Sequence, residues 1–97
     1  MSTRRVEEVS AQLMREISVL INESFAEKYG LITLTDLDVS PDFKNARAYI
    51  SVLEKKNEKN ALRDLELEAR KYQRILGRKL KMRFTPKITF SQDNMQE

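Results

Sequence analysis

The apolar residues between positions 6 and 25 recur every three or four residues, which is the spacing of one face of an α-helix. Gly30 follows the last turn of this pattern, where a left-handed C-cap favours glycine. The pattern predicts a helix from Thr3 to Tyr29 with one apolar face. That face is formed by Val6, Val9, Leu13, Ile17, Leu20, Ile21 and Phe25.

The hydrophobic period changes from about 3.6 to 2 after Gly30. Apolar and polar residues alternate from Leu31 to Ser40, and the alternation slips by one position around Asp36, which indicates a β-bulge. Ser40-Pro41-Asp42 is typical of a turn. A second alternating run extends from Asn45 to Leu53. The two runs predict an antiparallel hairpin.

Helical spacing returns after residue 60 and persists for about five turns. The apolar positions are Leu62, Leu65, Ala69, Tyr72, Leu76 and Leu80. A last strand is predicted from Arg83 to Ser91, with Phe84, Pro86, Ile88 and Phe90 on one face. Because Pro86 cannot donate a backbone hydrogen bond, this strand is expected at a sheet edge, or with regular pairing that starts after the proline.

The order helix, strand, strand, long helix, strand predicts an α+β fold, namely a two-layer sandwich in which helices cover one face of a three-stranded sheet. A chain of 97 residues has room for one compact core. We therefore expect a single domain over residues 1–91 and a disordered tail over residues 92–97. The side chains expected to face the helices are Leu34, Ala48, Ile50, Ile88 and Phe90.

The composition argues against catalysis. The chain has no cysteine and no histidine, which excludes Cys–His nucleophiles and zinc sites of the Cys/His type. Asp36, Asp38 and Asp42 lie along one strand and its turn, too dispersed to form a cation site, and the two glycines form no phosphate loop. We expect no enzyme, no metal and no cofactor. The absence of cysteine and of a long apolar run predicts a soluble cytoplasmic protein that does not engage a membrane.

Positive charge is concentrated in one segment. Between residues 70 and 87 there are eight basic residues and no acid, and such a segment favours a polyanionic partner. The candidate RNA-binding residues are Arg70, Lys71, Arg74, Arg78, Lys79, Lys81, Arg83 and Lys87. Arg70, Arg74 and Arg78 are four residues apart, so they form a row at about 6 Å spacing, and arginine pairs bidentately with phosphate. The alternative is an ordinary solvated helix face.

The charge pattern alone does not choose between RNA, DNA and anionic lipid. Lipid is the weakest choice, because the helix uses its apolar face for the sheet and has no second apolar stripe. On the face of the second strand opposite Ile50, Tyr49 is interpreted as covering the sheet edge, with stacking on a base as the alternative.

Several segments resemble the ribosome-binding factor A family. They are Arg4-Arg5-Val6, the run from Ile32 to Asp42, the run from Ala46 to Ser51, the run from Leu80 to Phe90, and Asp93. Together they span residues 4–93. The resemblance rests on the combination of a strand, Ser-Pro-Asp, a second strand and a basic, proline-containing last strand.

The resemblance implies a type II KH-like RNA-binding domain of order αββααβ, without the GxxG loop of ordinary KH modules. It implies a non-enzymatic monomer that binds 16S ribosomal RNA in the free 30S subunit, assists late 16S processing, and matters most in the cold. The family also has an Ala-x-Gly kink between two helices, where this chain has Glu68-Ala69-Arg70. Because no glycine is present there, we predict a helix that continues through this point.

Two other classes fit part of the pattern. A small DNA-binding module would share the basic helix, and it would then need a dimer interface or a turn between two short helices. A protein-interaction adaptor would use the acidic residues of the first helix, and its binding would respond little to salt. Those acidic residues are Glu7, Glu8, Glu23 and Glu27.

Overall fold

The first element of the computed structural model is helix α1 (Thr3–Tyr29), with the bounds predicted from its apolar stripe. The structure describes residues 3–93, and side chains from residue 5 onwards. Leu13, Ile17 and Ile21 of the stripe are buried in the core. Gly30 has φ of 70° and donates its N–H to Ala26 O at 2.9 Å, so the predicted left-handed end of the helix is confirmed.

Strands β1 (Ile32–Val39) and β2 (Asn45–Val52) form the predicted antiparallel hairpin. Leu34 pairs with Ile50 and Asp36 pairs with Tyr49, which leaves Thr35 as the extra residue of a bulge. Its hydroxyl donates to Tyr49 O at 3.1 Å. The slip in alternation around Asp36 therefore marked a real irregularity of the sheet.

Strand β3 (Lys87–Gln92) lies parallel to β2 and forms one edge of the sheet, whose order is β1-β2-β3. Its pairing starts directly after Pro86, as the missing N–H requires. The predicted start at Arg83 was therefore four residues too early. Phe84 was also misplaced, because this residue is 76% exposed and lies outside the sheet. β3 ends at Gln92, so the sheet includes the first residue of the expected tail, and residues 94–97 lie outside the described part.

Helix α2 (Glu58–Lys79) follows a short 3-10 turn, η1 (Lys55–Asn57), and connects β2 to β3. It runs without interruption through Glu68, Ala69 and Arg70, as the lack of glycine predicted. The order in this chain is therefore αββαβ, with one continuous helix where the αββααβ notation has two.

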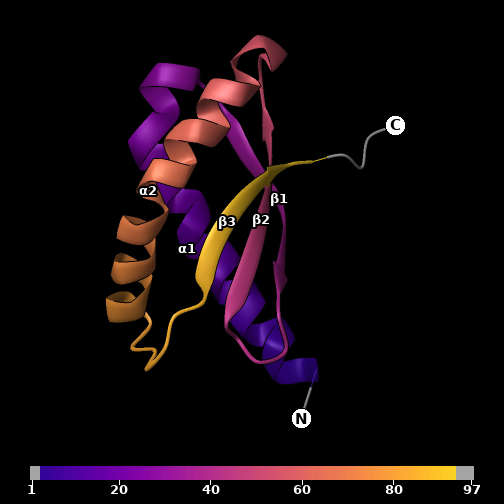
Figure 1. Cartoon of the computed structure of the whole chain (residues 1–97), viewed down its shortest axis with the longest axis vertical. Coiled ribbons are helices and arrows are strands. Elements are labelled where there is room, and N and C mark those ends of the chain that lie inside the picture. Colours follow the sequence, from indigo (N-terminus) through magenta and orange to yellow (C-terminus); the bar gives the residue numbers. More distant parts are fainter. Residues whose placement is uncertain (1–2, 94–97) are drawn as a thin grey trace.

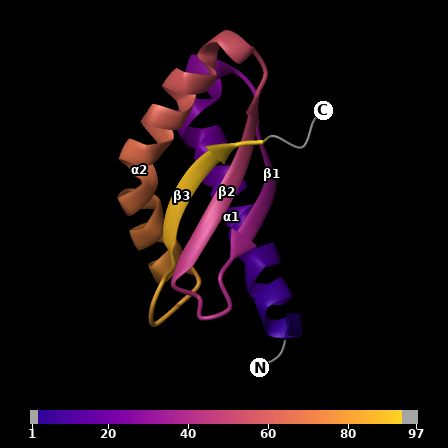
Figure 2. The same ribbon diagram turned by 45° about the vertical axis from the view of Figure 1, so that its right-hand side comes forward.

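Both helices cover the same face of the sheet, which confirms the α+β two-layer sandwich (Figures 1 and 2). Helix α1 packs on β1 and α2 packs beside β3. All five residues predicted to face the helices are buried, namely Leu34, Ala48, Ile50, Ile88 and Phe90. Neither helix in residues 3–93 combines the length and apolarity needed to cross a membrane.

Polar contacts fix the two helices against each other. The Tyr72 hydroxyl donates to Ser24 Oγ at 2.8 Å. Asp64 on α2 accepts from the Tyr29 hydroxyl at 2.6 Å and from Lys28 Nζ at 2.9 Å. Hydrogen bonds to α1, as well as packing, therefore hold α2 in one orientation, and this orientation determines which of its side chains face solvent.

Candidate nucleic-acid interface

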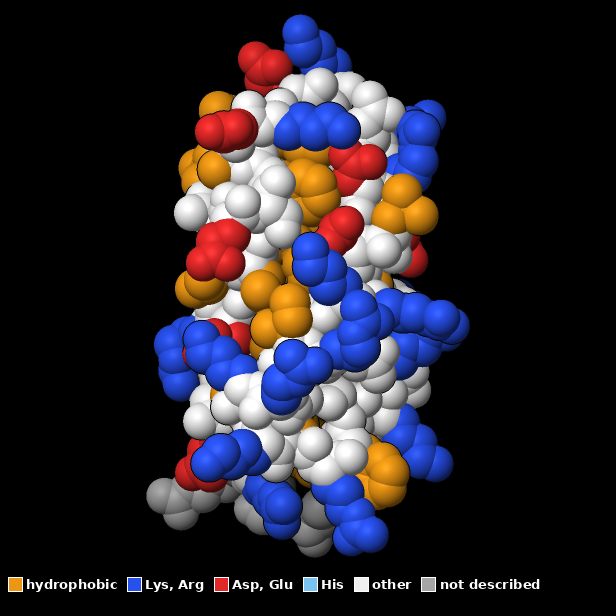
Figure 3. Space-filling view, turned by 90° about the vertical axis from the view of Figure 1, so that its left-hand side faces the viewer, with side chains coloured by type: hydrophobic (Ala, Val, Ile, Leu, Met, Phe, Trp, Pro, Cys, Tyr) orange, Lys and Arg blue, Asp and Glu red, His pale blue; other side chains and the backbone are white. Residues whose placement is uncertain are grey.

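The outer face of α2 carries an arginine row. Arg70, Arg74 and Arg78 are all exposed, while Tyr72 and Leu76 of the same turns are fully buried. Figure 3 shows Lys and Arg side chains predominating over the half of this face that contains the C-terminal end of α2, whereas acidic and basic side chains mix over the other half. The structure therefore presents this part of the predicted basic segment to solvent.

Two of the eight candidate residues lie beside acids. Lys71 Nζ is 3.6 Å from Glu68 Oε1, one turn earlier in the helix. Lys79 Nζ is 2.9 Å from Glu16 Oε1 on α1, and this carboxylate raises the pKa of the lysine. These two lysines are partly neutralised, Lys71 by a neighbour in its own helix and Lys79 by an acid that is distant in sequence. No ion pair among residues 5–93 involves the other six candidates.

A fourth arginine joins the row because the loop after α2 folds back over the helix. Gln73 Nε2 donates to Thr85 O at 2.9 Å, and Met82 N–H donates to Gly77 O at 3.0 Å. Gly77 is where this loop crosses the helix, since any β-carbon there would meet Thr85. Arg83 thereby comes to line a shallow hollow of about 490 Å³ together with Arg74 and Arg78.

The remaining candidates lie elsewhere. Lys81, at the end of α2, has φ of 54° and is exposed. Lys87 is exposed at the start of β3, and because Ile88 points to the helices, Lys87 points to the opposite face of the sheet. The structure thus gathers four arginines on one surface, whereas neither Lys81 nor Lys87 lines the hollow beside them. We call Arg70, Arg74, Arg78 and Arg83 the arginine surface.

The acidic residues of the hairpin have local roles. Asp36 Oδ1 accepts the N–H of Leu37 at 2.9 Å. Asp42 Oδ1 accepts the Ser40 hydroxyl at 2.7 Å and the Lys44 N–H at 3.0 Å, and these two hydrogen bonds lower the pKa of Asp42. Within the described residues, no three acidic side chains converge as metal ligands would. These carboxylates organise the bulge and the turn.

The fold and the arginine surface together define a small α+β protein with four exposed arginines on one surface. The family model "Ribosome-binding factor A" matches residues 5–97. A relative of that name from Acetivibrio thermocellus is 35% identical over 96 residues, which is 96% of this chain and 78% of that protein. A relative of the same name from Prochlorococcus marinus is 38% identical over 97 residues, which is 95% of this chain and 78% of that protein. The chain belongs to the ribosome-binding factor A family.

Solved structures support the same fold. The crystal structure of ribosome-binding factor A from Thermus thermophilus matches with a TM-score of 0.82 at 24% identity, over 94% of this chain and 98% of that one. A Thermus thermophilus RbfA homology model, fitted into a cryo-EM map of a 30S–RbfA complex, matches with a TM-score of 0.77 at 24% identity, over 92% and 96% of the chains.

Proposed function

We propose that this protein binds 16S ribosomal RNA in the free 30S subunit and assists its late maturation, with the greatest need at low temperature. Membership of the ribosome-binding factor A family supports a partner on the ribosome. The Thermus thermophilus relative has been fitted into a map of a 30S complex. The observation that carries the proposal for this chain is the arginine surface, four exposed guanidinium groups with no acidic partner among residues 5–93.

The arginine surface suits an RNA backbone for physical reasons. Successive arginines on α2 are about 6 Å apart along the helix axis, and each presents a planar fork that can bind two phosphate oxygens. Because the side chains are exposed, binding requires little desolvation of buried groups. Lys71, Lys79, Lys81 and Lys87 add to the positive field around this surface, and they complete the proposed RNA-binding set.

The proposed action is binding without chemistry. The protein acts as a cytoplasmic monomer, and it needs no cofactor, small-molecule substrate or membrane. It changes the course of 16S processing by holding one conformation of the precursor RNA, since a ligand shifts an equilibrium by its differential affinity for the two states.

Co-sedimentation with ribosomal particles tests the proposal. The variant Arg74→Glu/Arg78→Glu reverses two charges on the arginine surface. The matched control Lys59→Glu/Arg63→Glu makes the same charge change on exposed positions in the first turns of α2. We expect the parent and the control to sediment with free 30S subunits and leave 70S ribosomes unbound. The Arg74/Arg78 variant should bind at least about tenfold more weakly, because attraction to phosphate becomes repulsion.

Circular dichroism on the same samples checks that both variants are folded. A folded Arg74/Arg78 variant that binds like the parent would show that the arginine surface is an ordinary solvated face. The maturation role is tested separately, by measuring precursor 16S RNA in depleted cells grown in the cold and rescued by each variant.

A further inference from the structure

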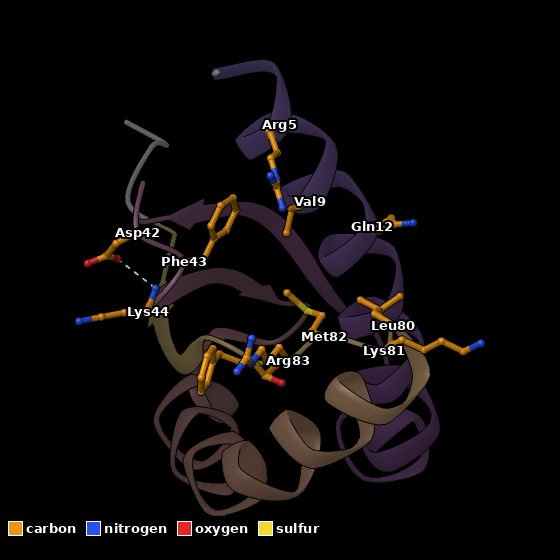
Figure 4. A pocket seen from close by; sticks show the side chains of 12 residues that line it. Arg5, Val9, Gln12, Asp42, Phe43, Lys44, Leu80, Lys81, Met82 and Arg83 are labelled. Carbon is orange, nitrogen blue, oxygen red and sulfur yellow. Dashed lines mark hydrogen bonds between the residues drawn. The ribbon is translucent and has the colours of Figure 1, made fainter. Parts of the chain in front are cut away.

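A second hollow lies on the other side of the loop that follows α2. It has a volume of about 710 Å³, within the range of about 300–1,000 Å³ that is typical of small-molecule sites. Its walls come from the start of α1, the turn between β1 and β2, and the loop between α2 and β3 (Figure 4). We call it the loop pocket.

The inner wall of the loop pocket is apolar. Val9, Phe43, Leu80 and Met82 line it, and all four are half-buried against the hydrophobic core. In Figure 4, Phe43 and Met82 extend into the same space from the hairpin turn and from the loop. The wall therefore offers a ring and a flexible thioether, side chains that bind flat apolar ligands well.

The rim of the loop pocket is cationic. Arg5, Lys44, Lys81 and Arg83 all line it, and the single lining acid, Asp42, already accepts hydrogen bonds from Ser40 and Lys44. Figure 4 shows Arg5 and Arg83 beside the space, whereas Lys44 and Lys81 point outward. An occupant with an apolar face and flanking negative charge would match this arrangement.

Phe84 connects the loop pocket to the arginine surface. It lines both hollows, together with Arg83 and Thr85. Phe84 is 76% exposed, and the Arg83 guanidinium carbon lies 5.6 Å from the centroid of its ring. A phenylalanine this exposed contributes little to the stability of the fold, and its ring is available to stack on a base.

The backbone of the loop pocket is strained. Phe43 and Lys81 have φ of 60° and 54°, and they are the only non-glycine residues in residues 3–93 with positive φ. Both line the loop pocket. The left-handed region is unfavourable for a bulky residue, and such strain concentrates at ligand sites. At Phe43 this conformation is held by a hydrogen bond from its N–H to Ser40 O at 2.8 Å.

We propose that the loop pocket binds one unstacked base of single-stranded RNA, with the strand continuing over Phe84 onto the arginine surface. The apolar wall receives the base, and Arg5 and Arg83 bind the flanking phosphates. Arg83, Phe84 and Thr85 line both hollows, so the two sites are continuous. A strand with bases for the apolar wall and phosphates for the arginines fits this surface better than an acidic peptide. This inference rests on the proposed RNA-binding function and adds recognition of bases to recognition of phosphates.

Fluorescence anisotropy with two short strands tests the inference. One probe is an oligoadenylate of about eight nucleotides, and the other is the same ribose-phosphate strand without bases. We expect the full chain to bind the base-bearing strand at least about fivefold more tightly, since stacking typically contributes that much per base or more. Phe43→Leu and Phe84→Leu should reduce this preference and leave the affinity for the abasic strand unchanged.

Matched controls separate bases from phosphates. Arg74→Gln/Arg78→Gln should weaken binding of both strands equally and keep the preference. Tyr49→Leu, on the opposite face of the sheet, should also keep it. Equal affinity of the parent for the two strands would contradict the proposed base site in the loop pocket, but not the proposed RNA-binding function. If neither strand binds, co-sedimentation with free 30S subunits distinguishes the two proposals. Binding to the subunits would contradict only the base site in the loop pocket, and absence of binding would contradict the proposed function as well.

A spectroscopic readout covers the case in which a variant fails to fold. With ¹³C-methyl methionine in the parent chain, the oligoadenylate should shift the Met82 signal, while the Met14 signal from α1, outside the pocket lining, stays in place. A Met82 signal that is unchanged at saturation would exclude a base in the loop pocket.

Discussion

Gly77 and Thr85 approach so closely that a β-carbon on Gly77 would lie 2.6 Å from the Thr85 hydroxyl oxygen. This contact lets the loop after α2 cross the last turns of the helix. The crossing brings Arg83 beside Arg74 and Arg78 and places Phe84 between the two hollows. A glycine in the interior of a helix ordinarily costs about 1 kcal/mol relative to alanine, so its presence here has a structural reason.

A double-mutant cycle at these two positions tests that reason. Gly77→Ala alone must displace Thr85, and this opposes the gain in helix propensity. In the Thr85→Ala background the obstruction is gone, so Gly77→Ala should stabilise the protein by about 1 kcal/mol. We expect a coupling energy of roughly 0.5–3 kcal/mol from urea unfolding of the four proteins. Additive effects would mean that the close approach does not constrain the loop.

Ile50 tests which face of the sheet forms the core. Its side chain is fully buried, so Ile50→Ala should destabilise the protein by about 2–5 kcal/mol through lost transfer energy and the cavity left behind. Leu53→Ala is the control, because Leu53 is 70% exposed and should change stability by less than about 0.5 kcal/mol. Equal urea midpoints for the two variants would contradict the packing.

The salt dependence of RNA binding should report the number of arginine contacts. If the protein neutralises roughly four to six phosphates of a single strand, the slope of log affinity against log salt should be about −3 to −4. Neutral replacement of Arg74 and Arg78 with glutamine should reduce that slope by about 1.4. A slope that does not change would assign the phosphate contacts to other residues.

The sequence predicted the elements whose hydrophobic periodicity extends over many residues, and a slip in that periodicity also predicted the bulge. The stripe from Val6 to Phe25 predicted α1 with its observed bounds, and the slip at Asp36 predicted the bulge. The start of the last strand was wrong because Phe84 alternates with Pro86 and Ile88 as a strand residue would. The left-handed turn at Lys81 and the contact at Gly77 override that alternation, and neither has a local signal.

The candidate site was predictable only in part, for a related reason. The row of Arg70, Arg74 and Arg78 follows from helical spacing alone. The acidic neighbour of Lys79 comes from α1, and the loop pocket joins residues from three separate segments. Contacts between segments that are distant in sequence leave no periodic pattern. Arg5, Phe43, Lys44 and Met82 could therefore not be recognised as a site before the chain was folded.

Lys81 occupies the left-handed position at the end of α2, where glycine is the usual residue. Lys81→Gly should stabilise the protein by about 0.5–1 kcal/mol. The left-handed conformation costs a non-glycine residue about 1–2 kcal/mol, and the larger conformational entropy that glycine loses on folding offsets part of this gain. Lys71→Gly, the same change inside α2, should destabilise it by about 1 kcal/mol. Urea midpoints that move in the same direction would contradict the strained conformation.

Asp64 gives the fold a pH-dependent link between its helices. Hydrogen bonds from the Tyr29 hydroxyl and then from the Lys28 ammonium hold the pKa of Asp64 below its ordinary value. Because the pKa is lower in the folded state, the carboxylate stabilises the fold above an ordinary pKa of about 4, and this contribution is lost as pH falls through the lowered pKa. The stability difference between the parent and Asp64→Asn should therefore shrink below about pH 4.

Urea unfolding at a series of pH values measures this difference, and Tyr29→Phe serves as the control. Without the hydroxyl, the pKa of Asp64 should return toward its ordinary value, so the pH dependence of stability should weaken. A parent-to-mutant difference that is constant from neutral to acidic pH would show that the contact does not act through the charge of Asp64.

The bulge at Thr35 lies on β1, which forms the border of the sheet opposite β3. A bulge twists an edge strand and interrupts its regular row of backbone donors and acceptors, and Asp36 and Asp38 add exposed charge to the same strand. At the other border, β3 has six residues and follows Pro86, which has no N–H to donate. Both borders are therefore poor templates for a strand from another molecule, and this protects a small protein from edge-to-edge aggregation.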